Sequence, residues 1–299
     1  MIDAGPTRTY RVSHRTTYRY SAVMTDGYSV GCLVPRPTDW QVVHEATVRL
    51  IPDASEWDSY VDVFGNLVNQ FGLHQPHDEM IVDAVSLVEL SQRPTPVDAT
   101  PWEDVAALAA SATGDLALEV GLFRSASDLI DVGALAPSLR KITDAVFLPG
   151  RPIVDAVGDL CRAIYEGFEF DAGFSTISTP LDEVLTARRG VCQDFAHLAI
   201  ACLRSLGLPA RYVSGYIETL PPPGTERLVG ADASHAWCAA WTPMAGWVDF
   251  DPTNGHLPVN EHVTVGWGRD YAEVTPVRGV MIGPATKQEL DVAVDVARV

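Results

Sequence analysis

Apolar and polar side chains alternate in several stretches between residue 8 and about residue 90, and Gly, Pro, Asn or Asp separates these stretches. They include TRTYRVSHRTTYRYS, EATVRLIPD, SYVDVFGNLVNQFGL and DEMIVDAVSLVEL. A period of two is typical of strands with one buried face, and the turn residues between them favour antiparallel connections. The pattern predicts an antiparallel β-sandwich or barrel in this part of the chain, and we expect the sandwich.

The pattern changes at SQRPTPVDATPW, where three prolines in twelve residues are incompatible with a continuing strand ladder. From about residue 103 to 167, apolar residues recur at helical spacing, and Pro152 suits a helix start. Strand-like stretches return after Pro209 and end in ELDVAVDVARV. The order predicts an α+β chain with a β-domain over 1–92, a linker and helical segment over 93–150, and a second domain of helices plus antiparallel sheet over 151–299.

Composition narrows the possible partners and the compartment. The formal net charge is −18, and such a surface repels both nucleic-acid phosphates and anionic lipid, so we expect neither partner. No apolar run approaches the roughly 18 to 20 residues of a membrane span, and the first twenty residues lack the apolar core of a secretory signal. The five cysteines form no CxxC pair, which favours reduced thiols, so we expect a cytoplasmic protein.

One cysteine stands at the predicted start of an apolar helix, in RRGVCQDFAHLAIACLRSLGLP. Gly190 permits a sharp entry, and Cys192 then falls in the first turn, where unpaired N–H groups and the helix dipole favour a thiolate. The same N–H groups can stabilise an oxyanion. We therefore interpret Cys192 as a nucleophile; the alternative is a small side chain packed under a sheet.

A thiol nucleophile needs a base and a group that orients the base. His235 begins the strand-like run SHAWCAAWTP, and a hairpin through MAG would bring it beside an aspartate of GWVDFDPT. The residues alone leave both Asp251 and Asp249 open as the orienting group.

The other histidines have plainer interpretations. His197 lies five residues after Cys192 and is rotated away from the thiol, as a packing histidine would be. His256 and His262 fall in loop-like sequence. A metal site at His74 and His77 would need a third convergent ligand, so we expect no metal.

Three separated blocks, RRGVCQDFAHLAIACLRSLGLPARYVSGY, SHAWCAAWTPMAGWVDFDPTNG and GRDYAEVTPVRGV, together resemble the bacterial branch of the transglutaminase-like superfamily. The start of the chain, with YRVSHRTTYRY, LVPRP, DVFGN and PHDEMIVDA, resembles the N-terminal domain that accompanies this branch. The resemblance implies a papain-like catalytic domain with Cys192, His235 and Asp251 as its triad. Asp251 is preferred over Asp249 because the family's aspartate precedes a Pro-Thr pair.

The resemblance defines the remaining site less completely. Family members often supply a second oxyanion donor from an aromatic N–H or O–H upstream of the cysteine, but GFEFDAGFS offers only phenylalanines there. Tyr165, Gln193 or a backbone amide is the expected substitute. Trp237, Asp270 and Tyr271 are candidates for the walls of the substrate cleft, with core packing or loop capping as the alternative.

The triad implies attack of the thiolate on an amide or ester carbonyl and a thioester acyl-enzyme. Water would complete a protease or amidase reaction, and an amine would complete a transglutaminase reaction. We expect hydrolysis of a peptide or protein substrate without a cofactor, because no dense acidic loop resembles the calcium sites of animal crosslinking enzymes. Glutamine acyl transfer and a non-catalytic binding module are the alternatives; the oligomeric state stays open.

Overall fold

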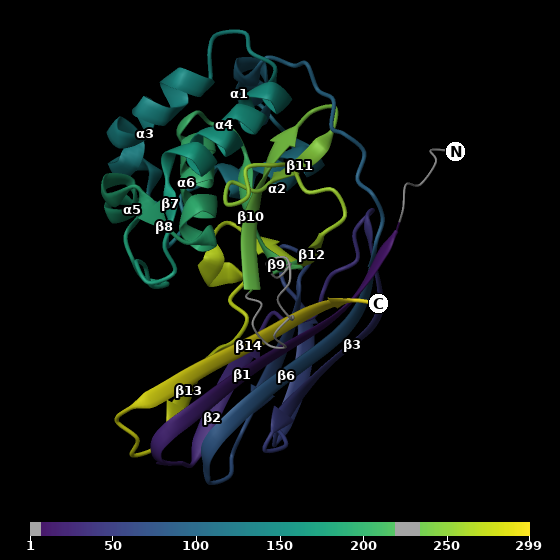
Figure 1. Cartoon of the computed structure of the whole chain (residues 1–299), viewed down its shortest axis with the longest axis vertical. Helices are drawn as coiled ribbons and strands as arrows, with labels where there is room; N and C mark the ends of the chain where they lie inside the picture. Colours follow the sequence, from purple (N-terminus) through teal and green to yellow (C-terminus); the bar gives the residue numbers. More distant parts are fainter. Residues whose placement is uncertain (1–6, 219–233) are drawn as a thin grey trace, which may run out of the picture.

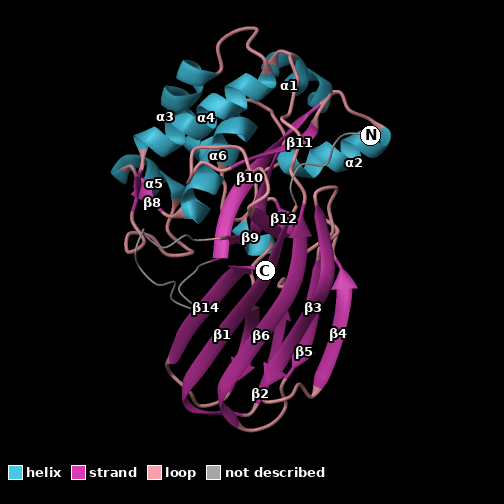
Figure 2. Cartoon of the chain, turned by 45° about the vertical axis from the view of Figure 1, so that its right-hand side comes forward, coloured by secondary structure: helices cyan, strands magenta, loops and turns pink. Residues whose placement is uncertain are grey.

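The computed structural model describes residues 7–218 and 234–299. The chain folds into two lobes, one made of strands and the other of helices around a small sheet (Figures 1 and 2). The predicted α+β class and the N-terminal antiparallel sandwich are confirmed.

The strand lobe consists of two four-stranded antiparallel sheets. One has the order β14-β1-β6-β3, with β1 (Arg8–Met24), β3 (Gln41–Ile51), β6 (His77–Leu90) and β14 (Gln288–Arg298). The other has the order β13-β2-β5-β4, with β2 (Asp26–Gly31), β4 (Glu56–Val61), β5 (Leu67–Gly72) and β13 (Arg278–Ile282). Alternate residues of β6 from Met80 to Leu90 are buried, as the period of two predicts.

The end of the chain returns to the strand lobe. β14 pairs antiparallel with β1, with Val296 opposite Val12, and β13 pairs with β2. The predicted second domain, 151–299, included these residues, because an alternating pattern identifies a strand but not the strand with which it pairs. The second lobe therefore ends before Arg278, and the first and last strands of the chain, β1 and β14, both lie in the sandwich (Figure 1).

Helices build most of the other lobe. They are α1 (Trp102–Ala110), α2 (Gly114–Gly121), α3 (Val132–Val146), α4 (Ile153–Gly167), α5 (Leu181–Ala187) and α6 (Cys192–Ser205), with short 3₁₀ turns η1 (Leu122–Arg124) and η2 (Tyr271–Glu273). Proline occupies the N-cap of α1, α4 and α5, where its missing N–H leaves no helical hydrogen bond unmade. Within the described residues no single helix has the length and apolarity to cross a membrane; the bent pair α1 and Gly114–Arg124 meets that test by length and composition only.

A third antiparallel sheet has the order β11-β10-β9-β12, made of β9 (Ala210–Ile217), β10 (Ser234–Thr242), β11 (Gly246–Phe250) and β12 (His262–Gly268). A short parallel pair, β7 (Glu169–Phe170) and β8 (Arg189–Gly190), leads into α6. The α6 helix is buried from Asp194 to Arg204 and packs on β9 and β10. This packing brings the start of α6 to the sheet that carries His235.

The two lobes share an apolar core. Side chains of β1, β6 and β14 pack with Tyr216, Val263 and Val265 of the third sheet. Gln41 adds two hydrogen bonds to the backbone of Thr264, each 2.7 to 2.8 Å long. The sandwich is therefore a packing support for β9 and β12 and so for the site beside them.

Candidate active site

The nucleophile position is defined by the turn that precedes α6. Cys192 is the first residue of the helix and is partly exposed, whereas the chain's other four cysteines are buried. The Asp194 side chain folds back to accept the N–H of Val191 at 2.8 Å. A Cβ on Gly190 would lie 2.7 Å from that carboxylate, so only glycine allows this approach. Asp194 thus caps the helix start, and the free N–H groups of the first turn lie at Cys192.

His235 lies at the second position of β10, opposite Gly215 of β9. Its Nε2 is 2.7 Å from Oδ2 of Asp251, which leaves Nδ1 for the thiol. Burial alone lowers the pKa of His235, but its interactions with Asp251 and with Cys192 outweigh this effect and raise the pKa to about 10. The imidazolium form is therefore favoured at neutral pH, as a thiolate–imidazolium pair requires.

Asp251 follows β11 in a tight turn and is fully buried. Its Oδ1 accepts the N–H groups of Thr253 (2.9 Å) and Asn254 (3.2 Å), so the turn itself orients the carboxylate. Its Oδ2 accepts from His235 and, at 2.7 Å, from Nδ2 of Asn254. Burial tends to raise the pKa of Asp251, but the two histidine partners hold it well below its usual range, so the group is an anion.

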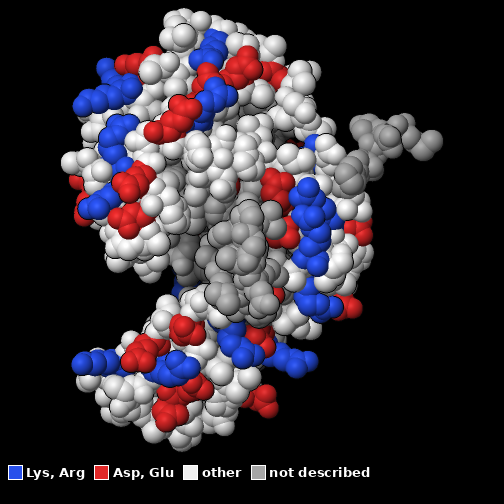
Figure 3. Space-filling view, viewed as in Figure 1, with Lys and Arg blue, Asp and Glu red and all other residues white. Residues whose placement is uncertain are grey.

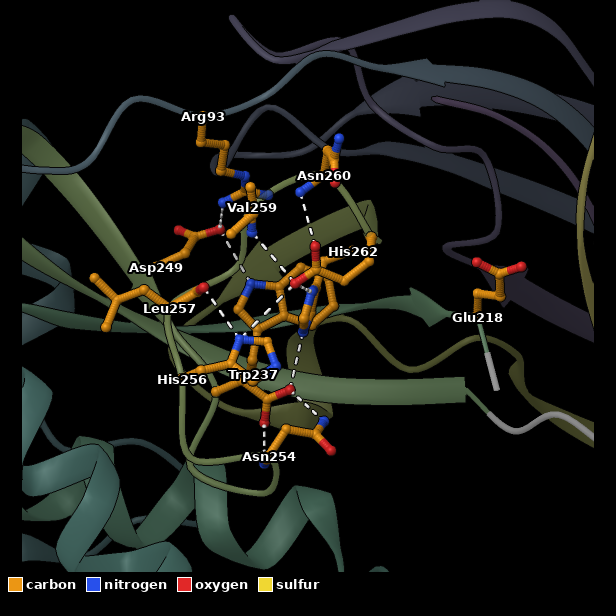
Figure 4. Close-up of polar contacts among 12 residues, drawn as sticks. Arg93, Glu218, Trp237, Asp249, Asn254, His256, Leu257, Val259, Asn260 and His262 are labelled. Carbon is orange, nitrogen blue, oxygen red and sulfur yellow. Dashed lines mark hydrogen bonds and ion pairs between the residues drawn. The ribbon is translucent and has the colours of Figure 1, made fainter. Parts of the chain in front are cut away.

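Asp249, the rival aspartate, has other partners. Its carboxylate forms an ion pair with Arg93 and accepts Nε1–H of Trp237 at 3.1 Å (Figure 4). Arg211 lies 3.9 Å from the other oxygen of this carboxylate. Burial raises the pKa of Asp249, but the two arginines outweigh it and lower the pKa. Asp249 therefore neutralises buried arginines, and Asp251 is the partner of His235.

Comparison with known proteins agrees with this geometry. Residues 140–252, which contain all three side chains, match the transglutaminase-like superfamily, and residues 10–89 match the bacterial transglutaminase-like N-terminal region. The chain belongs to the transglutaminase-like superfamily.

Relatives of this superfamily member match it over different lengths. An uncharacterised Mycobacterium tuberculosis protein is 42% identical over 97% of this chain and 93% of its own length. A protein-glutamine gamma-glutamyltransferase of Pseudomonas aeruginosa is 40% identical over 31% of this chain and 15% of its own length. The structure titled "a Putative Cysteine Protease from Cytophaga hutchinsonii" has a TM-score of 0.72 and 20% identity over 97% of this chain and 91% of that one, which shows a shared fold.

The structure adds a second histidine to the site of this transglutaminase-like protein. His262 begins β12, is buried, and places Nε2 2.9 Å from the same Oδ2 of Asp251. Its Nδ1 lies 3.3 Å from Oε1 of Glu261. The prediction that His262 lies in a loop is wrong. The alternation in HVTVGWG was the signal that could have placed it on a strand.

Tyr212 is a further hydroxyl near the nucleophile. It lies on β9, is buried, and packs its ring 5.1 Å from that of His197 and 6.2 Å from that of Tyr271. Burial and then the negative charge of Cys192 raise the pKa of Tyr212 well above its usual value, so the hydroxyl keeps its proton. The structure thus offers a neutral O–H donor close enough to Cys192 for the two groups to interact electrostatically, and it comes from downstream of the cysteine rather than upstream.

Two of the expected oxyanion or substrate residues lie on the helices around the site. Tyr165 is 53% exposed on α4, and its ring covers Gly255 in the turn that holds Asp251. Gln193 donates from Nε2 to the carbonyl oxygen of Ile177 at 3.4 Å. Neither contact assigns an oxyanion role, and both assignments stay predictions.

The three expected cleft residues are mostly engaged in packing. Trp237 is fully buried behind the ring of His235, 6.1 Å away. Asp270 is buried, caps η2 and accepts the N–H of Leu129 at 2.8 Å. The backbone N–H of Tyr271 donates to Nε2 of His197 at 3.1 Å. These contacts position the walls of the site from behind.

The site also contains a group of possible metal ligands. His235, Asp251 and His262 offer three ligand atoms within 4.8 Å of one another. The 2.7 and 2.9 Å separations from Oδ2 are hydrogen-bond distances, whereas ligands around a tetrahedral zinc lie roughly 3.3 Å apart. The arrangement fits protons between these atoms better than a metal. In the strand lobe, His74 pairs with Asp26 and His77 contacts the Gln75 carbonyl, so these two histidines have separate partners.

Proposed function

We propose that the protein catalyses cysteine-dependent acyl transfer from an amide through a thioester, with water as the usual acceptor. The observation that carries this proposal is the buried His235, whose ring interacts with Cys192 on one side and with the Asp251 carboxylate on the other. The three side chains therefore form a connected triad of a nucleophile, a group that carries the proton and an anion that orients this group.

The reaction begins when the Cys192 thiolate attacks the carbonyl carbon of a peptide or protein amide. The backbone N–H of Cys192 and the hydroxyl of Tyr212 are the proposed donors to the oxyanion. The His235 imidazolium gives its proton to the leaving amine as the C–N bond breaks, and a thioester remains. His235 then takes a proton from water, the resulting hydroxide attacks the thioester, and the C–S bond breaks to release the acid and the thiolate.

Transfer to an amine is the second candidate, and one observation favours it. The gamma-glutamyltransferase of Pseudomonas aeruginosa is 40% identical to this chain over 102 residues. An amine would replace water in the second half of the reaction and would use the same three side chains. The protein as proposed needs no cofactor, and the cytoplasmic location and the absence of nucleic-acid and membrane partners stay predictions.

The test offers a glutamine-containing peptide with and without dansylcadaverine, a fluorescent primary amine. Hydrolysis predicts the same products in both reactions and no fluorescent product: two shorter peptides if a backbone amide is cleaved, or glutamate and ammonia if the glutamine side chain is the substrate. Transfer predicts fluorescent peptide instead. Cys192→Ala must abolish either product, and activity that survives this substitution would refute the proposed nucleophile.

A further inference from the structure

A cavity of about 420 Å³ lies between α3, α5 and α6, and its lining includes Gln193 but not Cys192 itself. These three helices pack together in the helical lobe (Figure 1). Gln193, Asp194 and His197 of α6 form one wall. Because Gln193 directly follows Cys192, this wall is continuous with the helix start that carries the thiol. The volume lies within the roughly 300–1,000 Å³ range of pockets that bind small ligands.

Carboxylates are the only charged groups among the residues that line this cavity. Asp128, Asp131 and Asp182 lie exposed at its rim, and no lysine or arginine lines it. The side chains of Asp128 and Asp182 accept no hydrogen bond from the residues that the structure describes, whereas Asp131 uses one oxygen to cap α3. Arg269, a cation near Asp128, is already paired with Glu273. The rim therefore attracts cations.

The α6 wall of the cavity also carries a hydrogen-bond donor. His197 is 5% exposed, and its Nε2 accepts the N–H of Tyr271, so a neutral ring carries its proton on Nδ1. Burial lowers the pKa of His197 to about 4; Arg204 adds to this shift, and Asp270 opposes it. Over residues 7–218 and 234–299, Nδ1 has no hydrogen-bond partner. Because Nδ1 has no partner among these residues and is not fully buried, it is accessible from the cavity that His197 lines and can donate to a carbonyl oxygen of a bound ligand.

We infer that this cavity binds a lysine or arginine side chain of the peptide substrate, at or next to the residue whose carbonyl is attacked. The three rim aspartates receive the cationic group, and Nδ1–H of His197 donates to a peptide carbonyl. The inference rests on the proposed function, because it assigns the cavity to the substrate of Cys192. Its consequence is a preference for basic peptides close to the reacting bond.

The test uses dipeptidyl chloromethyl ketones, in which the Cys192 thiolate displaces chloride and forms a thioether. Lysine occupies either of the two positions, and norleucine, which lacks the ammonium group, replaces it in matched reagents. The rate of modification at Cys192 is measured by mass spectrometry. We expect at least one lysyl reagent to react about tenfold faster than its norleucyl match, since each rim ion pair contributes a factor of about 2 to 5.

The decisive variant is Asp128→Asn/Asp131→Asn/Asp182→Asn, in which asparagine keeps the capping role at position 131. We expect the lysyl-to-norleucyl ratio to fall towards one. The control Asp115→Asn/Asp144→Asn/Asp155→Asn changes net charge equally at exposed sites that do not line the cavity, and should keep the ratio. If the triple variant does not fold, the single variants Asp128→Asn and Asp182→Asn replace it. Each should lower the lysyl-to-norleucyl ratio by a smaller amount.

The outcomes separate the two proposals. A ratio near one in the wild type, or a preference that survives in the triple variant, overturns the cavity assignment while Cys192 still reacts. A Cys192 that no reagent modifies faster than the buried cysteines overturns the proposed function itself.

Discussion

Replacing Asp251 by Asn removes the negative charge beside His235 and keeps the size of the side chain. The rise in the pKa of His235 from 6.5 to about 10 corresponds to about 5 kcal/mol in favour of the imidazolium. Asp251 and Cys192 supply this stabilisation together. If the carboxylate supplies half, its loss slows acylation by about 10²-fold, and if it supplies all, by about 10³- to 10⁴-fold.

The assay is the burst of p-nitrophenol from p-nitrophenyl acetate at pH 7, which reports acylation without knowledge of the natural substrate. Cys192→Ala defines the background. Asp249→Asn is the matched control, because Asp249 contacts Arg93, Arg211 and Trp237 instead of His235. We expect its burst rate within about threefold of wild type. Its Tm should fall by several degrees, since breaking a buried ion pair costs about 3–5 kcal/mol. A larger rate loss in Asp249→Asn than in Asp251→Asn would refute the assignment of the orienting group.

Three further predictions follow from the same contacts. Tyr212→Phe should slow the burst about 10²- to 10³-fold with little change in Tm, as the loss of an oxyanion donor does; a change below threefold would remove Tyr212 from the mechanism. His262→Ala should slow the burst about 10- to 100-fold by removing a donor to Asp251, and His262→Gln should restore part of the rate. The pKa of Asp251 is lower in the folded than in the unfolded protein, so its ionised carboxylate stabilises the fold above the unfolded pKa of about 3.9. This stabilisation is lost progressively as pH falls below that value. Thermal melts between pH 3 and 6 should therefore fall more steeply for wild type than for Asp251→Asn, and parallel curves would contradict the shift.

Local patterns along the chain predicted the strands, the start of α6 and the place of Cys192 in its first turn. Each of these depends on neighbours in sequence: alternation in β6, or Gly190 before a cysteine at a helix N-terminus. The choice between Asp249 and Asp251 needed a resemblance, because both lie near the end of one strand. What separates them physically is Arg93, 156 residues away in the linker, which pairs with Asp249.

Long-range pairing is what local patterns could not supply. The alternation in 288–298 identifies a strand, yet nothing local says that it covers the edge of β1 at the other end of the chain. His262 contacts Asp251 only because β12 pairs with β9 and thereby faces the turn after β11. The role of Tyr212 could not be predicted from the sequence either, since its position near Cys192 results from the packing of α6 on β9.

The most direct test of the central claim is the rate at which iodoacetamide alkylates each cysteine of the folded protein at pH 6. Cys192 and Cys202 fall in one tryptic peptide, 190–204, so fragment spectra must separate them. Burial raises the pKa of Cys32, Cys161 and Cys202 to about 12, and these thiols should stay unreactive. We predict that Cys192 reacts at least about tenfold faster than any other cysteine and that His235→Gln removes this advantage. Alkylation of Cys192 no faster than that of the buried cysteines, or unchanged by His235→Gln, would contradict the thiolate–imidazolium pair.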